Sequence, residues 1–528
     1  MVSRTDQRNV GAMHDGPAAT DPDRVALVDG ETGDEYRYAE LAALVNRASN
    51  VFDDHGVTPG DRVPLLFDNS IRYPVVLFGA IRAGAVPVPV NWRLPRPQIE
   101  HVLDDCGGSV AVLAADPAVR ETAVPAIRNT DEISIALVDG ATDCAVGDTE
   151  RIGLGNALEA AADTYDPVSV TADDPALQPY TSGSTGRPKG VVLTHGGVSW
   201  NVNAFVDHLS LDATERALVV TPLYHKNAMS GAIKPMIRTG GSTVILDEGD
   251  PQRALACIER YDVTYVTGVP VVFKRLVAAA RSGEGRDLGS LEWVSCGSAT
   301  VPESLADDIR EVLGAELLEV YGLTEGGPVV THTPREGPRK RGSAGRPLPG
   351  VETRVVDPGT GRECQRGEPG ELLVSNPGVG AYVGQDVGGG KYFYLIDGRQ
   401  YRRTGDLVHV DDDGYHFVHG RLDEMINVGG ENVYPAEVEE VLQRHAAVLD
   451  VAVVPVPHAE KGSAPVAFVV TDGPASEADL QSFALERGPA YAHPRRVFLR
   501  DSLPETGTGK CDRDALAETA RLLVDDPL

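Results

Sequence analysis

Short runs of β-branched residues alternate with longer stretches whose apolar residues recur at helical spacing, and this alternation constrains the fold more than any other feature. The run 25–30 (VALVDG) predicts a strand, and the stretch 38–56 predicts a helix that stops at Gly56. Further strands are predicted at 62–67, 109–115 and 242–248, with helices at 76–84, 255–261 and 273–282. Such alternation is typical of α/β layers with largely parallel sheets.

The texture of the chain changes after about residue 340. Glycine and proline become dense, and short strands are predicted at 353–357, 370–375 and 416–420. From residue 423 onward the pattern returns to a compact α+β unit with a helix from Pro435. We therefore expect a large N-terminal α/β domain (1–422) with a β-rich subdomain (340–422). A hinge near Asp423 is expected to join it to a small, mobile C-terminal domain (423–528).

Charge excludes one broad class of function. The 528 residues include 48 basic and 78 acidic side chains, a net charge of −30, which repels nucleic-acid phosphates and anionic lipid surfaces. Nucleic-acid binding is therefore not expected as the main role. Only eight of the basic residues are lysines. Acidic excess with few lysines predicts a protein adapted to high salt, with ordinary bacterial acidity as the alternative.

The cysteines and the apolar runs bear on location. Six cysteines are scattered singly without a C-x-x-C pair, which disfavours zinc ribbons and fits a reducing cytoplasm. The beginning of the chain lacks the apolar stretch of a signal peptide. The most apolar run, from Pro74, is interrupted by Arg82 and falls short of the roughly 20 residues that a membrane helix needs. We expect a cytoplasmic protein without a membrane span.

The most informative segment is YTSGSTGRPKG (180–190), which precedes the β-branched run VVLTH. Its small residues allow backbone N–H groups to approach an anion closely, and its hydroxyls and Lys189 add donors and a positive charge. The spacing differs from a Walker A loop, because Pro188 precedes the lysine and Gly190 follows it. The segment predicts a phosphate-binding loop, and the alternative is a flexible polar surface loop.

This loop resembles the phosphate loop of the adenylate-forming superfamily, which includes acyl-CoA synthetases, aryl-CoA ligases, luciferases and the adenylation domains of peptide synthetases. Four further stretches match the family in order and spacing: YGLTEGG (321–327), RRTGDL (402–407), GRLDEMINVGGENVYPAEVE (420–439) and PETGTGKCDR (504–513). The resemblance spans nearly the whole chain, from about residue 21 to 524. It identifies the chain as similar to AMP-dependent acyl-CoA synthetases.

The resemblance implies roles for individual residues. Lys510 would bridge the substrate carboxylate and the α-phosphate of ATP, Glu325 and Thr185 would hold Mg²⁺, and His225 would flank the bound acid. Read alone, YGLTEGG could be a turn that stops a helix, and Asp406 a solvated turn residue. The implied nucleotide-binding residues are Thr181, Ser182, Gly183, Ser184, Thr185, Gly186, Lys189, Gly297, Ser298, Ala299, Tyr321, Gly322, Thr324, Asp406 and Arg421.

Two positions, Lys226 and Asn427, depart from the family pattern. A separate glycine pair supports a thiol acceptor. Amino-acid-activating members carry an aspartate near the position of Lys226, whose ammonium would instead repel an α-amino group; a solvated or CoA-facing lysine is the favoured alternative. Asn427 stands where many members have lysine. Gly429 and Gly430 resemble the loop that lines the pantetheine channel, where side chains would block a narrow tunnel.

Three hypotheses follow. The first is an AMP-forming acyl-CoA synthetase that uses ATP, Mg²⁺ and coenzyme A to activate a fatty or aryl acid with an uncharged tail. The second keeps the fold but passes the acyl group from a stand-alone adenylating enzyme to a carrier protein or another acceptor. The third is a nucleotide-binding regulator without turnover. It is disfavoured because the chain retains all the implied metal and transfer groups: Lys189, Glu325, Asp406, Arg421 and Lys510. The sequence leaves open whether copies associate as a homo-oligomer.

Overall fold

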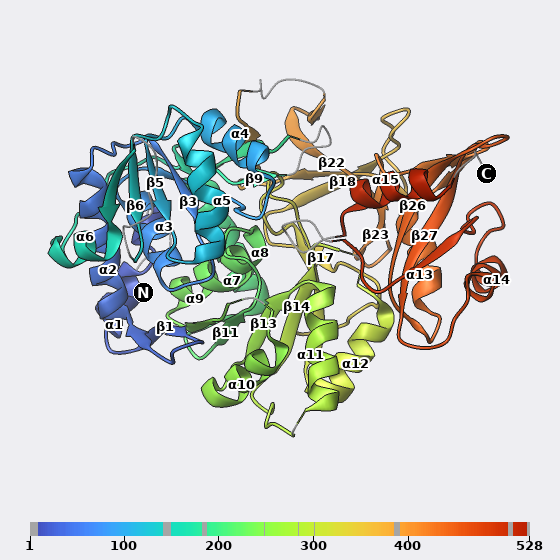
Figure 1. The fold of residues 1–528 in the computed structure, drawn as a ribbon, viewed down its shortest axis with the longest axis horizontal. Coiled ribbons are helices and arrows are strands. Elements are labelled where there is room, and N and C mark those ends of the chain that lie inside the picture. The colour runs from blue at the N-terminus through green and yellow to red at the C-terminus, as the bar shows by residue number, and fades with distance from the viewer. Residues whose placement is uncertain are drawn as a thin grey trace.

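The computed structural model describes residues 9–140, 149–181, 187–247, 249–283, 285–299, 301–384, 391–504 and 511–524. Its centre is a nine-stranded sheet in which the strands from β15 to β1 run parallel, while β17, β16 and β2 pair antiparallel at the edges (Figure 1). In spatial order the strands are β17 (Arg346–Pro347), β16 (Thr331–His332), β15 (Glu316–Tyr321), β14 (Trp293–Gly297), β13 (Tyr265–Gly268), β11 (Arg216–Val219), β12 (Ser242–Ile245), β1 (Val25–Asp29) and β2 (Glu35–Arg37).

Helices cover both faces of this sheet because successive residues of its strands point to opposite sides. Val266, Val294 and Cys296 pack under one group of helices, α10 (Pro251–Tyr261), α11 (Pro270–Ser282) and α12 (Glu303–Leu313). Tyr265 and Trp293 belong to the core on the other face. That face carries α7 (His195–Leu209), α8 (Lys226–Ala228), a π-helical turn (Met229–Ile233) and α9 (Lys234–Thr239).

A second, five-stranded parallel sheet lies in the N-terminal third. Its strands, in spatial order, are β4 (Val86–Pro89), β3 (Arg62–Leu66), β5 (Val110–Leu113), β6 (Ile135–Val138) and β7 (Glu150–Gly153). The helical segments of this region are Val10–Ala12, α1 (Asp15–Thr20), α2 (Tyr38–Asp54), α3 (Arg72–Arg82), α4 (Arg96–Cys106), α5 (Pro117–Arg128) and α6 (Leu154–Ala160). The strands and helices predicted from the alternation in residues 25–115 are confirmed.

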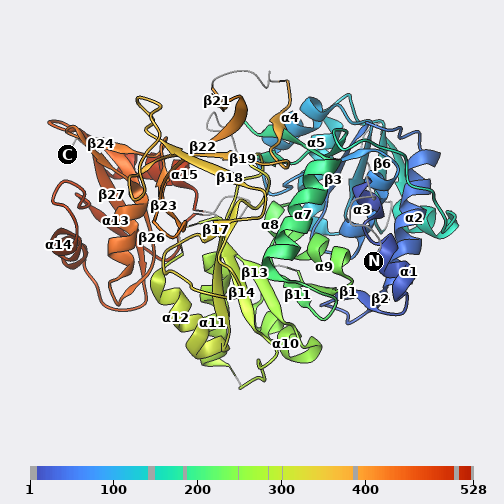
Figure 2. The same cartoon turned by 180° about the vertical axis from the view of Figure 1, so that it is seen from behind.

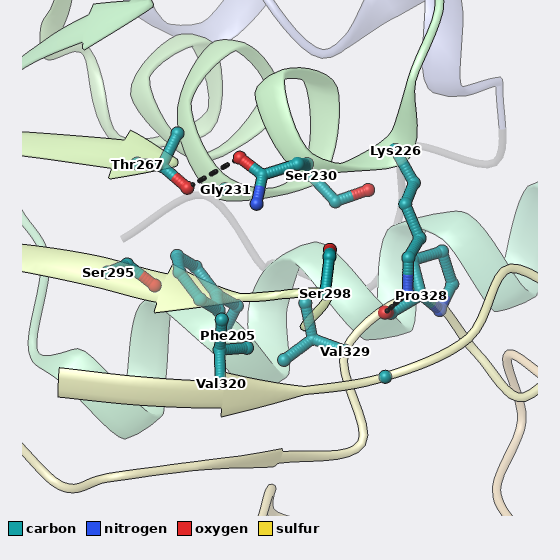
Figure 3. A pocket seen from close by; sticks show the side chains of 12 residues that line it. Phe205, Lys226, Ser230, Gly231, Thr267, Ser295, Ser298, Val320, Pro328 and Val329 are labelled. Atoms are coloured by element: carbon teal, nitrogen blue, oxygen red, sulfur yellow. Dashed lines mark hydrogen bonds between the residues drawn. The ribbon is translucent and has the colours of Figure 1, made fainter. Parts of the chain in front are cut away.

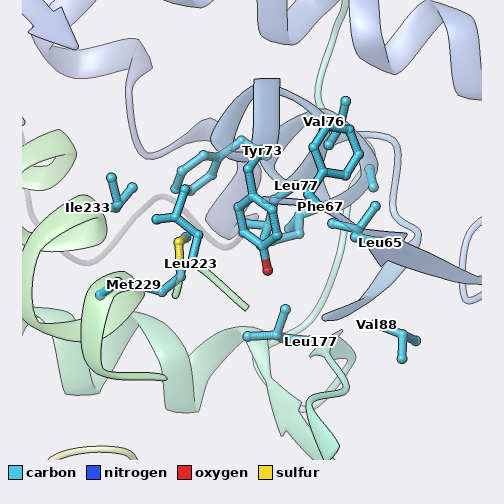
Figure 4. Packing of buried hydrophobic residues seen from close by; sticks show 14 of the residues in the cluster. Leu65, Phe67, Tyr73, Val76, Leu77, Val88, Leu177, Leu223, Met229 and Ile233 are labelled. Carbon is cyan, nitrogen blue, oxygen red and sulfur yellow. The ribbon is translucent and has the colours of Figure 1, made fainter. Parts of the chain in front are cut away.

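One apolar cluster joins this layer to the π-helical turn. Figure 4 shows Tyr73 and Leu177 facing Met229 and Ile233, which lie one turn apart. All four side chains are buried. The packing holds the Met229 and Ile233 side of the turn against the N-terminal layer. Ser230 and Gly231, which lie between them in the sequence, face a different side of the turn.

Two smaller sheets follow. The first contains β20 (Ala381–Tyr382), β10 (Lys189–Thr194), β8 (Pro175–Leu177) and β9 (Tyr180–Thr181). The second contains β18 (Glu352–Val356), β19 (Gly370–Ser375), β22 (Arg399–Val410), β21 (Phe393–Ile396) and β23 (His416–Arg421). The three short strands predicted after residue 340 all belong to the second of these sheets.

The C-terminal unit is a five-stranded sheet with helices. Its strands are β25 (Glu431–Val433), β24 (Ile426–Val428), β27 (Gly462–Thr471), β26 (Val448–His458) and β28 (Val497–Arg500), and its helices are α13 (Pro435–Gln443), α14 (Glu477–Arg487) and α15 (Arg513–Leu523). Both views place this unit at the end of the molecule opposite the N-terminal layer (Figures 1 and 2). The predicted α/β architecture with a small α+β unit at its end is confirmed.

Lys274 of α11 reaches across to the C-terminal unit. Its Nζ donates to Leu449 O at 2.8 Å and lies 3.8 Å from Asp450 Oδ1. The side chains of Lys274 and Asp450 are 32% and 47% exposed, so solvent weakens this ion pair. We refer to it below as the Lys274 contact.

Within the described residues, every helix is too short or too polar to cross a lipid bilayer.

Candidate functional site

The carboxyl ends of β13, β14 and β15 meet at one edge of the central sheet and form a pocket with the π-helical turn. Ligands of open α/β sheets bind at such an edge. Glycine is needed at two points of this edge. A Cβ on Gly297 would lie 2.0 Å from Val320 O, and one on Gly322 would lie 2.1 Å from Pro328 O. Ser298, which follows β14, has a left-handed φ of 66°.

Tyr321 and Asp406 come from different sheets but are hydrogen-bonded. Tyr321 ends β15, and its Oη donates to Asp406 Oδ2 at 2.5 Å. Burial, followed by the charge of Asp406, raises the pKa of Tyr321 well above its usual range, so the phenol keeps its proton. Arg421 Nη1 lies 3.3 Å from Asp406 Oδ1. The structure thus brings together three of the predicted nucleotide-binding residues.

Arg421 also anchors the segment that leads into the C-terminal unit. Its Nε and Nη2 donate to the two carboxylate oxygens of Asp423 at 3.0 and 3.2 Å. Leu422 N donates to Gly405 O at 2.8 Å, which holds the same segment against the β22–β23 pair. The predicted hinge therefore begins directly beside the Asp406 carboxylate.

Glu325 lies in a second cluster, which contains two residues that the sequence did not single out. Its Oε1 accepts a hydrogen bond from Tyr382 Oη at 2.8 Å and lies 3.9 Å from Arg402 Nη2. Arg402 is 2% exposed, and its guanidinium lies 4.4 Å from the Tyr382 ring centre and 5.1 Å from that of Phe393. The RRTGDL motif contained Arg402, but nothing in the sequence showed that an aromatic cage surrounds it.

The predicted phosphate loop is described only at its ends. Thr181 and Lys189 pair in the antiparallel β9–β10 ladder, and Lys189 Nζ lies 5.9 Å from the Tyr382 ring centre. The charged end of the loop therefore approaches the Glu325 cluster. Other predicted residues lie outside the described part of the chain, namely Ser182, Gly183, Ser184, Thr185, Gly186 and Lys510.

Lys226, rather than His225, lines the pocket. His225 caps the beginning of α8, and its Nδ1 accepts from Asn227 N at 3.3 Å. Lys226 Nζ donates to Pro328 O at 3.2 Å across the pocket wall (Figure 3). Lys226 is half-buried in this wall, and whether its ammonium faces solvent, coenzyme A or the acid stays a prediction.

The rest of the wall contains polar residues that the sequence did not predict. Asn227 and Ser230 come from the segment of α8 and the π-helical turn, and Thr267 and Ser295 come from β13 and β14. Gly322 and Ser298, both predicted to bind nucleotide, line the same pocket. Ala299 is exposed at the end of β14, and Thr324 is half-buried in the turn that follows β15.

Gly429 and Gly430 form the turn between β24 and β25. Gly430 N donates to Asn427 Oδ1 at 3.0 Å, and both glycines have positive φ angles, of 65° and 100°. Figure 2 places β24 at the outer end of the C-terminal unit, far from α8 at the pocket. The structure does not bring this turn to the pocket, and its contact with coenzyme A stays a prediction.

Comparisons with known proteins agree with this geometry. Residues 15–381 match the AMP-binding enzyme family, and residues 437–510 match the AMP-binding enzyme C-terminal domain. A feruloyl-CoA synthase from Amycolatopsis is 38% identical over 93% of this chain and 95% of its own length. An indoleacetate–CoA ligase from Aromatoleum aromaticum is 34% identical over 95% and 96%. A fatty acid–[acyl-carrier-protein] ligase from Streptomyces coeruleorubidus is 32% identical over 93% and 92%.

Solved structures show the same architecture. ATP-bound MatB from Rhodopseudomonas palustris superimposes with a TM-score of 0.87 at 29% identity, over 98% of this chain and 99% of its own. An anthranilate CoA ligase in complex with anthranoyl-AMP has a TM-score of 0.88 at 25% identity, over 98% of both chains. Sequence and structure agree along almost the whole chain, and the chain belongs to the AMP-binding enzyme family.

Proposed function

We propose that the chain is an AMP-forming carboxylate–CoA ligase. The proposal rests on the C-terminal end of β15, where two adjacent residues contact two different predicted sites. Tyr321 is hydrogen-bonded to the carboxylate predicted to hold the ribose, and the next residue, Gly322, lines the pocket in which we place the acid. An acid in this pocket lies beside a nucleotide held at Asp406, as bond formation between the two requires.

The reaction has two steps. A carboxylate oxygen attacks the α-phosphorus of ATP, the bond to the β-phosphate oxygen breaks, and pyrophosphate leaves with the bonding electrons. The thiol of coenzyme A then attacks the acyl carbon, AMP leaves as the C–O bond breaks, and the thiol proton passes to solvent. Positive charge near the phosphates, from Lys189 and Lys510, opposes the repulsion between two anionic reactants in the first step.

The donor set around Glu325 fits Mg²⁺. Within the described residues no donor reaches Glu325 Oε2, and there is no cluster of three acidic, histidine or cysteine side chains that would form a closed metal cage. Mg²⁺ is typically held by one or two carboxylates together with substrate phosphates. Glu325 with Thr185 would hold the ion, which would neutralise phosphate charge when bound.

Replacing Glu325 by Gln should therefore raise the Mg²⁺ concentration needed for half-maximal activity and lower kcat by about 10- to 100-fold, because one charged ligand is lost. Tyr382 can still donate to the amide oxygen, so the fold should be retained. Pyrophosphate release across a Mg²⁺ titration measures the effect. An unchanged Mg²⁺ dependence would remove Glu325 from the metal site.

The acceptor could differ, and one comparison favours a specific second candidate. The similarity to a ligase that loads an acyl carrier protein extends over 93% of this chain. The alternative function is therefore acyl transfer to a carrier protein. The resemblance of the Gly429–Gly430 turn to the loop that lines the pantetheine channel is compatible with both acceptors, because coenzyme A and a carrier protein each present a phosphopantetheine thiol.

A panel of acids tests the proposal. Pyrophosphate release that requires acid, together with thioester formation that requires coenzyme A, supports the ligase. Thioester formation only with a phosphopantetheinylated carrier protein would support the alternative. Pyrophosphate release that is independent of every acid would contradict both. We expect α-amino acids to be poor substrates, because Lys226 brings a positive charge to the pocket wall.

Composition supports a further proposal, that the protein works in the cytoplasm of a salt-adapted cell. Salt shortens the range of repulsion among the 78 acidic residues. Raising KCl from 0.1 to 2 M should stabilise the protein by about 1–2 kcal/mol, which corresponds to about 1–2 °C in Tm for a chain of 528 residues. Sucrose of equal osmolality serves as the control, because it leaves charge repulsion unscreened. A Tm that falls or stays constant with KCl would contradict this.

Ultracentrifugation at both salt concentrations determines whether copies associate.

A further inference from the structure

Two hydroxyl groups lie side by side in the depth of the pocket. Thr267 of β13 and Ser295 of β14 are partners in the parallel ladder, and both side chains are almost fully buried. Neighbouring strands are about 4.8 Å apart, so one small ligand group can reach both hydroxyls. Figure 3 shows the two side chains on adjacent strands at one end of the pocket, with Lys226 and Pro328 at the other.

The position of these hydroxyls limits the length of a ligand. Gly297, at the end of β14, is two residues beyond Ser295 on the same face, which corresponds to about 7 Å along the strand. Two residues in the other direction, Trp293 stacks on Tyr265 with ring centres 4.2 Å apart, and both rings are buried. Neither ring lines the pocket, and both belong to the buried core that lies beyond the hydroxyls. An acid whose carboxylate lies near Gly297 therefore reaches them with a single ring or a chain of similar length.

The hydroxyl of Ser295 has its proton committed to His332. The Nδ1 of His332 lies 2.6 Å from Thr333 O, and because a carbonyl can only accept, Nδ1 carries the ring proton. Burial lowers the pKa of His332 to about 3, so the ring is neutral and its Nε2 is an acceptor. Ser295 Oγ, 3.0 Å from Nε2, must donate to it. The Ser295 oxygen is therefore available to a ligand in the pocket only as a hydrogen-bond acceptor.

The hydroxyl proton of Thr267 is likewise donated to a protein acceptor. Its Oγ1 donates to Asn227 Oδ1 at 2.8 Å, and the amide orientation is supported because Asn227 Nδ2 faces Gly268 O at 3.4 Å. The Thr267 oxygen is therefore also left as an acceptor. Two buried acceptors at one depth favour a ligand group that donates a hydrogen bond, and they disfavour a carboxylate, which can only accept.

We infer that the pocket selects a short carboxylic acid, cyclic or linear, whose far end carries a hydroxyl or amine donor, and that Ser295 and Thr267 determine this selectivity. The inference rests on the proposed ligase function and narrows its substrate class. A phenolic aryl acid is the simplest case, because its ring spans the distance and its O–H points at the two oxygens. A long-chain fatty acid is disfavoured, because Tyr265 and Trp293, beyond the two hydroxyls, are part of the buried core.

Matched acids test the donor requirement. Benzoate, 3- and 4-hydroxybenzoate and the corresponding methoxybenzoates form one series, and 3-phenylpropanoate with its hydroxy and methoxy derivatives forms another. A methoxy group keeps the oxygen but removes the donor. We expect kcat/KM of one hydroxy acid in a series to exceed that of both its unsubstituted and its methoxy partner by at least about tenfold, the contribution of roughly one buried hydrogen bond.

Variants then assign the selectivity to the two residues. Ser295→Ala and Thr267→Val should each lower the hydroxy-to-unsubstituted ratio, and the double variant should bring it close to one while the unsubstituted acid is still turned over. Ser49→Ala is the matched control. It removes a buried serine hydroxyl, bonded to Val45 O and Gly79 O, from α2 in the N-terminal layer. If Ser295→Ala fails to fold by circular dichroism, Thr267→Val and Ser295→Cys carry the test.

The outcomes separate this inference from the function on which it rests. Release of pyrophosphate and thioester formation with acids that lack a donor, at rates equal to those of their hydroxy partners, would overturn the inference and leave the ligase intact. A hydroxy preference that survives the double variant would overturn the roles of Ser295 and Thr267. Failure of every acid to release pyrophosphate would instead overturn the proposed function.

Discussion

Replacing Lys510 by Ala should reduce acid-dependent pyrophosphate release about 100- to 1,000-fold, the loss expected when a group that stabilises transition-state charge is removed. The same variant should still convert a supplied acyl-adenylate and coenzyme A to thioester at a rate within about tenfold of wild type, because that step transfers no phosphoryl group. The measurement is the ratio of the loss in pyrophosphate release to the loss in thioester formation, with the two half-reactions assayed separately.

Arg521→Ala is a suitable control for Lys510→Ala. It removes one positive charge from the same unit, at an exposed position in the last turn of α15. It should leave both half-reactions nearly unchanged. Equal losses of both half-reactions in Lys510→Ala would show that the lysine supports the C-terminal unit as a whole, and would refute its assigned role in adenylation.

Replacing Asp406 by Ala should raise KM for ATP about 100-fold or more, because each hydrogen bond to a charged group contributes about 1.5–3 kcal/mol and the carboxylate is predicted to accept two from the ribose. It should also destabilise the free protein by about 1–3 kcal/mol, since Tyr321 Oη loses its acceptor and Arg421 loses one of its two carboxylates. Tm without nucleotide and initial rates over an ATP titration separate the two effects.

Asp411→Ala is the matched control for Asp406→Ala. Asp411 lies just after β22 in the same sheet, pairs with Lys340 and accepts from Tyr415 N at 2.9 Å. Its loss removes an ion pair in which Tyr321, Asp406 and Arg421 take no part, so Tm can fall while KM for ATP stays the same. If both variants change KM for ATP alike, Asp406 contributes to the fold of this sheet rather than to nucleotide binding.

Local patterns predicted most of the elements because each depends on neighbouring residues. The helix at 38–56, the buried strand at 62–67 and the short strands after residue 340 all appear at or near their predicted positions. Pairing between distant segments does not leave such a pattern. The order of the nine-stranded sheet was not predicted, since it depends on packing between segments up to hundreds of residues apart. The α15 helix was also missed, although Asp512 caps its first turn and Leu516 and Ala520 are buried at helical spacing.

The candidate site divides in the same way. Tyr321, Asp406 and Arg421 were identified through motifs, and the structure brings them into contact. Thr267 and Ser295 were missed because a hydroxyl inside an apolar strand has no sequence signature. The register of β13 and β14 places these hydroxyls side by side, and Asn227 and a histidine 37 residues beyond Ser295 give them a direction. Selectivity of this kind depends on proton positions that no linear pattern encodes.

The Lys274 contact has a consequence for turnover. An exposed ion pair of this kind contributes at most about 1 kcal/mol and is weakened by dissolved ions. Because so weak a contact breaks readily, we expect it to offer little resistance to the predicted movement of the C-terminal domain about its hinge. Dissolved salt would then have two effects. It would stabilise each domain by screening repulsion among its acidic residues, and it would weaken the Lys274 contact between the two domains.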